Sequence, residues 1–140
     1  MSLFRLLVEI EKMAEQFTED WFIHLWGTQD KLEREAARRI FRKHFAGENC
    51  LTHIDPAMVA RDRGNMTEAV ESVVDHVDTS IAHMDKKPAE IPTFQELHTA
   101  IDAISRAFRK YYLLMTADEF DLETVAVNHD WERIFTLPWK

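Results

Sequence analysis

The chain has few of the residues that interrupt helices or cross-link a fold. Its 140 residues include three glycines and four prolines, so long helices can form through most of its length. A single cysteine, Cys50, excludes an internal disulfide and a zinc site built from several thiolates, and it favours a reducing, cytoplasmic compartment. The N-terminal segment is neither a signal peptide nor a membrane span, because Glu9, Glu11 and Lys12 interrupt its apolar pattern.

Basic residues are also relatively few, with 17 Lys and Arg against 25 Asp and Glu. The formal net charge of −8 argues against a general electrostatic affinity for nucleic acid. Basic residues are nevertheless concentrated on two segments, Lys31, Arg34, Arg38, Arg39, Arg42 and Lys43 on the first and Arg106, Arg109 and Lys110 on the second. Such residues usually form solvated helix faces, and a local basic strip is the alternative.

Apolar residues recur at steps of three and four, which is the spacing of amphipathic helices. With 46% hydrophobic and 30% charged residues, the composition is that of a globular protein. The pattern predicts main helices from Leu3 to Leu25, from Leu32 to Phe45, from Met66 to Ile81 and from Phe94 to Met115, with a short helix from Pro56 to Gly64. We therefore predict a single all-α domain over residues 1–140, an up-and-down bundle of four main helices plus short extra helices.

Capping signals mark where these helices begin and end. Thr93 and Glu96 have the spacing of a capping box. Gly27 and Gly64 are predicted helix ends, because glycine accepts the left-handed conformation that terminates helices. The predicted N-caps are Asp30, Asp55, Asn65 and Thr93.

Seven histidines make metal binding the first chemistry to weigh. His76 and His83 share a helix face, but two turns separate them by about 10.5 Å, which one zinc ion cannot bridge. Neither a His-x-x-x-His pair nor a Glu-x-x-His motif occurs. Cys50 lies near His53 without an oxyanion-stabilising turn. We expect no metal and no cofactor.

His83 is the remaining candidate for chemistry. It is predicted at the C-terminal end of a helix, where the helix dipole stabilises a protonated histidine by about 0.3–1 kcal/mol. That structural role is the simpler interpretation. The functional alternative is general acid–base catalysis, for which histidine is suited at neutral pH.

The run from Val70 to Met115 resembles the HEPN domain superfamily, most closely its abortive-infection-like branch. The similar stretches are Ile81-Ala82-His83-Met84-Asp85 with the Lys-Lys-Pro that follows, Thr93-Phe94-Gln95-Glu96-Leu97-His98, Tyr111-Tyr112-Leu113-Leu114 and Asp130-Trp131-x-x-Ile134-Phe135. The resemblance implies a dimeric α-bundle, often a metal-independent ribonuclease of bacterial defence or toxin–antitoxin systems. The family motif is an arginine, about four other residues and a histidine, with two copies meeting at a dimer cleft.

In this chain His83 matches the family histidine, and Asp78 stands where the arginine is missing. A carboxylate repels the phosphate that an arginine would hold. The sequence therefore predicts a divergent HEPN-like protein with weakened or lost ribonuclease activity and a binding or regulatory role. We expect a homodimer, with RNA or an antitoxin protein as further partners.

Two alternatives remain open, so the sequence does not decide whether the chain is an enzyme. One is an active metal-independent ribonuclease in which His83 is the base and an arginine comes from elsewhere, including the partner subunit. The candidates for that cation are Arg61, Arg63, Arg106 and Arg109. The other is a plain structural helical bundle that binds a protein partner.

Overall fold

The computed structural model of the protein describes residues 2–49, 51–78 and 91–118. Their elements are α1 (Leu3–Lys12), the short 3₁₀ turn η1 (Ala14–Gln16), α2 (Glu19–Leu25), α3 (Lys31–His44), α4 (Pro56–His76) and α5 (Phe94–Thr116). The predicted all-α class is confirmed in this part of the chain. Cys50, His83 and Trp131 lie outside the described residues.

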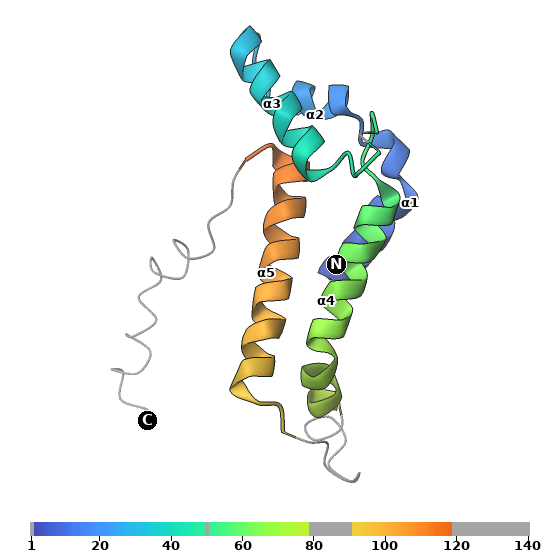
Figure 1. Ribbon diagram of the computed structural model, residues 1–140, viewed down its shortest axis with the longest axis vertical. Coiled ribbons are helices and arrows are strands. Elements are labelled where there is room, and N and C mark those ends of the chain that lie inside the picture. The colour runs from blue at the N-terminus through green and yellow to red at the C-terminus, as the bar shows by residue number, and fades with distance from the viewer. Residues whose placement is uncertain (1, 50, 79–90, 119–140) are drawn as a thin grey trace, which may run out of the picture.

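The two longest helices form an antiparallel hairpin that sets the long axis of the molecule (Figure 1). With 21 and 23 residues, α4 and α5 are about 31 and 34 Å long. Helix α1 packs against α4, and α2 packs against α3. Figure 1 shows α2 and α3 at the end of the hairpin where α4 begins and α5 finishes.

Large buried side chains hold that end together. The rings of Phe22, Phe41 and Phe45 are fully buried, and their centroids lie 5.6–5.8 Å apart, a range in which aromatic pairs are favourable. Further fully buried side chains are Leu7, Ile10, Ile54, Val59, Tyr111 and Leu114. Along the rest of the hairpin α5 buries only small residues, Ala100 and Ala107.

The single helix predicted over residues 3–25 is wrong, because the chain leaves the helical path after α1. Residues 17–19 pair with residues 52–54 through backbone hydrogen bonds of 2.8 and 3.0 Å, on either side of an isolated antiparallel bridge between Thr18 and His53. The Thr18 side chain then caps α2 by accepting a hydrogen bond from the Trp21 N–H. This long-range pairing uses backbone groups that a continuous helix would need.

The predicted helix end at Gly64 is also wrong. Helix α4 continues through Gly64 and Asn65, so the two helices predicted on either side of this point are one. Gly64 is not among the glycines with positive φ, and a Cβ atom built on it would meet no atom within 4 Å. The other predicted stop is confirmed, since Gly27 has a φ of 65° directly after α2.

Three of the predicted N-caps are confirmed. Asp30 accepts hydrogen bonds from two N–H groups in the first turn of α3, and Asp55 caps α4 in front of Pro56. Thr93 and Glu96 form the full capping box at the start of α5, with the Thr93 N–H 2.6 Å from a Glu96 carboxylate oxygen. The fourth, Asn65, lies inside α4.

Candidate functional site

Of the two positions compared with the HEPN motif, 78 and 83, the structure describes position 78. Asp78 lies two residues beyond the end of α4 and is exposed to solvent. His83 falls in residues 79–90, outside the described residues. Asp78 therefore places an exposed carboxylate at one end of the hairpin.

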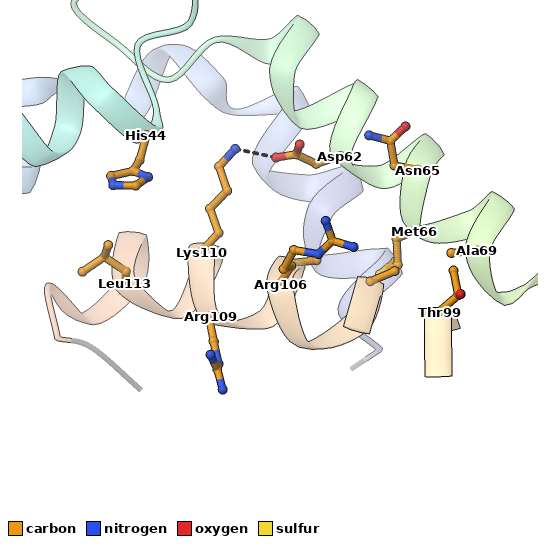
Figure 2. A pocket seen from close by; sticks show the side chains of 12 residues that line it. His44, Asp62, Asn65, Met66, Ala69, Thr99, Arg106, Arg109, Lys110 and Leu113 are labelled. Atoms are coloured by element: carbon orange, nitrogen blue, oxygen red, sulfur yellow. Dashed lines mark hydrogen bonds and ion pairs between the residues drawn. The ribbon is translucent and has the colours of Figure 1, made fainter. Parts of the chain in front are cut away.

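A groove with a volume of about 960 Å³ lies between α4 and α5 and reaches the last residue of α3 (Figure 2). Its apolar lining includes Met66, Ala69, Ala103, Ala107 and Leu113. Its polar lining is His44, Asp62, Asn65, Thr99, Arg106, Arg109 and Lys110. The groove thus combines a small apolar floor with a mainly cationic rim.

The cations of the groove come from α5. Arg106, Arg109 and Lys110 stand three and four residues apart, so a helix brings them to one side. Figure 2 shows Arg106 and Lys110 projecting toward α4, whereas Arg109 projects away from it. The second basic segment of the sequence therefore contributes side chains to a groove as well as to a solvated face.

The Asp62 carboxylate on α4 contacts α5 and offsets part of the positive charge of the groove. The Asp62 Oδ2 atom lies 2.6 Å from Lys110 Nζ and accepts a hydrogen bond of 2.9 Å from the Tyr111 hydroxyl. Tyr111 is 1% exposed. Burial, together with the Asp62 charge, raises the pKa of Tyr111 far above its usual value. Tyr111 therefore stays a neutral donor, and Lys110 is held by Asp62.

The first basic segment is engaged differently. Glu19 on α2 receives hydrogen bonds of 2.8 Å from both Arg38 and Arg42 on α3. Burial raises the pKa of Glu19, but the bonds and charges of Arg42 and Arg38 outweigh it, and the net pKa is lowered. These two arginines therefore tie α2 to α3.

Arg63, named as a possible relocated cation, also has a structural contact. Its guanidinium lies 3.1 Å from the Glu11 carboxylate and 5.5 Å from the centre of the Phe4 ring. Arg63 thereby joins α4 to α1. Of the other candidates, Arg106 and Arg109 share the groove, and Arg61 lies near the start of α4.

The groove cations are separated from Asp78 by several helical turns, with Arg106 near the middle of α5 and Lys110 further from Asp78. Lys110 is bonded to Asp62, and from Asp62 to His76, the last residue of α4, the helix rises about 21 Å. Arg106 stands one turn nearer on α5. Two site residues, Asp62 and Tyr111, were missed by sequence reasoning. They are 49 positions apart in sequence and meet only because α4 and α5 pack antiparallel.

The described residues contain neither a candidate metal site nor a candidate membrane-spanning helix. Within residues 2–49, 51–78 and 91–118, no group of three or more His, Cys, Asp or Glu side chains is arranged to hold a metal. In the same residues, none of the helices combines the length and the apolarity that crossing a bilayer demands.

Fold and site together define an all-α helical protein with a cation-rimmed groove between its two longest helices. Comparison of the chain with protein-family models, with curated proteins and with solved structures finds no match. The HEPN resemblance accordingly stands on the sequence stretches quoted above.

Proposed function

We propose that this chain is a divergent HEPN-like protein whose ribonuclease chemistry is weakened or lost and which acts as a binding module for RNA. The observation that carries the proposal is the distribution of charge along the α4–α5 hairpin. An exposed carboxylate, Asp78, occupies the motif position, and the α5 cations line a groove several helical turns away along the hairpin.

Loss of cleavage follows from the charge at the motif. Cleavage of RNA by a 2′-hydroxyl needs a base for its proton and a cation for the charge that builds on the phosphate. His83 is the candidate base. Asp78 supplies the opposite sign to the one that the transition state requires. The α5 cations line the groove several helical turns away from it.

Binding is supported by the chemistry of the groove. Arginine donates several hydrogen bonds in a planar fork that matches phosphate oxygens, and Arg106 projects into the space between the helices (Figure 2). The apolar floor offers a surface for a sugar or base. A volume of about 960 Å³ lies within the range of ligand sites in proteins.

The cleavage half of the proposal is tested by restoring the missing arginine. We expect the purified full-length protein not to cleave structured or transfer RNA in the presence of a chelator. Asp78→Arg should gain cleavage, and Asp78→Arg combined with His83→Ala should lose it again, because the gain needs both the cation and the base. Wild-type cleavage that disappears in His83→Ala contradicts the loss of chemistry and favours the active-ribonuclease alternative.

The binding half is tested by fluorescence anisotropy with a labelled single-stranded RNA across a salt series. Arg106→Glu should weaken binding about tenfold and reduce the slope of log affinity against log salt by about 0.7. The matched control is Arg34→Glu, an exposed arginine on α3 outside the groove, which should change affinity little. Equal effects of the two variants, or no binding, contradict this assignment, and no binding leaves a helical bundle that binds a protein partner.

A further inference from the structure

The groove between α4 and α5 continues past Thr99 toward the start of α5. A second hollow of about 460 Å³ lies there, and Asn65, Ala69 and Thr99 line both it and the first. In Figure 2, Ala69 and Thr99 lie beyond Arg106, on the side away from Lys110. The two hollows therefore form one continuous groove along the hairpin.

The two ends of this groove carry opposite charge. The rim of the second hollow is acidic, with Glu68 and Glu71 on α4 and Glu96 on α5, whereas α5 cations line the first. Hydrogen bonds from the Thr93 backbone N–H and hydroxyl lower the pKa of Glu96, so this carboxylate is ionised at neutral pH. Between Glu96 and Arg106, helix α5 rises about 15 Å, and the charge of the groove changes sign over that distance.

This change of sign limits how a nucleic acid can occupy the groove. A polynucleotide carries a negative charge at every phosphate. A strand that continued along the whole groove would bring its phosphates against Glu68 and Glu71, which is unfavourable. A strand that ends between Arg106 and these acids avoids that repulsion. The groove therefore favours the end of a strand over its interior.

The acidic end also distinguishes the two ends of an RNA. The 3′-terminal ribose has two adjacent hydroxyl groups and no charge, whereas a 5′ end presents one hydroxyl or a phosphate. Carboxylates accept hydrogen bonds from ribose hydroxyls, and Glu68 and Glu71 supply them. The Thr99 hydroxyl donates a hydrogen bond of 2.8 Å to the Gln95 carbonyl, so its oxygen serves as a further acceptor. This part of the groove thus suits a neutral group with two donors.

We propose that the groove binds the 3′ end of an RNA that carries free 2′ and 3′ hydroxyls. Arg106 binds the last phosphodiester, the apolar floor around Met66 and Ala103 packs against the terminal base, and the terminal ribose lies toward Glu68 and Glu71. The inference rests on the proposed binding of RNA by this groove, and it adds which part of the RNA is bound.

Competition against a 5′-labelled RNA with a free 3′ end, followed by fluorescence anisotropy in the presence of a chelator, tests this inference. The unlabelled competitors have one sequence and differ in their ends. A 3′-phosphate, or closure of the strand into a circle, should weaken binding about fivefold to tenfold, because a phosphate then meets the carboxylates. A 2′,3′-dideoxy end should weaken it about fivefold, because the ribose hydrogen bonds are lost.

Matched charge variants locate the effect in the groove. Glu68→Gln combined with Glu71→Gln should reduce the penalty for a 3′-phosphate to about twofold or less. Glu15→Gln combined with Asp20→Asn removes the same charge from exposed positions outside both hollows and should leave the penalty unchanged. Far-UV circular dichroism confirms that each variant is folded.

The outcomes separate this inference from the proposed function. Equal competition by all the RNA ends overturns the inference, and RNA binding itself stands if Arg106→Glu still weakens it. Absence of RNA binding overturns both. A 3′-phosphate penalty that is the same in the two double variants removes the role of Glu68 and Glu71 and overturns the inference. A larger effect of a phosphate at the 5′ end than at the 3′ end shows that the opposite end is bound, and overturns it as well.

Discussion

At the scale of single residues, the Asp62 side chain links α4 to α5 through two polar contacts. It is 23% exposed and holds both Lys110 and the buried Tyr111 hydroxyl. Tyr111→Phe removes one hydrogen bond and should lower the free energy of unfolding by about 1 kcal/mol. Asp62→Ala should cost about 2–3 kcal/mol, because it leaves the Tyr111 hydroxyl without its acceptor in the core.

Urea denaturation of the two single variants and the double variant measures this coupling. The double variant should cost less than the sum of the single ones, since both remove the same bond. Asp102→Ala is the control, because Asp102 is an exposed carboxylate on α5 and its removal should change stability by less than about 0.5 kcal/mol. Strictly additive losses contradict the bond between Asp62 and Tyr111.

Glu19 makes a contribution that depends on pH. Its pKa is below the ordinary value of 4.5 in the folded protein, so the ionised form stabilises the fold above that value and the benefit is lost as pH falls through the lowered pKa. Glu19→Gln should cost about 1–2 kcal/mol at pH 7, since the glutamate side chain is 15% exposed and bonded to two arginines.

The measurement for Glu19 is urea denaturation of wild type and Glu19→Gln between pH 7 and pH 3. The difference between them should be constant at neutral pH and shrink below pH 4.5. Glu35→Gln is a suitable comparison, because Glu35 pairs with Arg38 as a 51% exposed side chain and should change stability little. A difference that grows on acidification shows that the sign of the Glu19 shift is wrong.

At the scale of helices, two glycines provide a matched test of backbone conformation. A Cβ atom would meet nothing within 4 Å at either Gly27 or Gly64, but Gly27 has a φ of 65° and Gly64 lies inside α4. Gly64→Ala should stabilise the protein by about 0.5–1 kcal/mol, since alanine is the better helix former. Gly27→Ala should destabilise it by about 1 kcal/mol, because alanine strains the left-handed conformation.

Thermal unfolding of both variants decides this prediction. Opposite shifts of Tm confirm that α4 is continuous through Gly64. A loss of stability in Gly64→Ala instead places a helix break at this position, as the sequence pattern predicted.

Helix starts were predictable from the sequence because capping is local. Asp55 and Thr93 bond to N–H groups within three residues of themselves, so the signal lies within one turn of chain. The break after α1 was not predictable in the same way. It depends on residues 52–54, more than thirty residues further along the chain, and the apolar spacing of residues 3–25 is compatible with a continuous helix.

The buried face of α5 shows a second limit of periodicity. The spacing of Phe94, Ile101 and Phe108 predicted the helix, and α4 nevertheless packs on Ala100 and Ala107. Small side chains allow two helices to approach closely along their length. A pattern read from one chain identifies both stripes as apolar and does not say which one that chain buries.

The candidate site was predictable only in part. The basic residues of α5 were visible in the sequence as a cluster, and the structure brings Arg106 and Lys110 to one groove. The contact of Lys110 with Asp62 was not visible, because it spans 48 residues and requires the register between α4 and α5. Asp78 was predicted at the motif position, and the structure adds that its carboxylate is exposed.

At the scale of the whole molecule, the apolar core is unevenly distributed. Phe22, Phe41 and Phe45 are fully buried at the α2–α3 end, whereas the opposite end of the hairpin exposes Val77 and Phe94. The second end therefore has less buried area of its own to stabilise it.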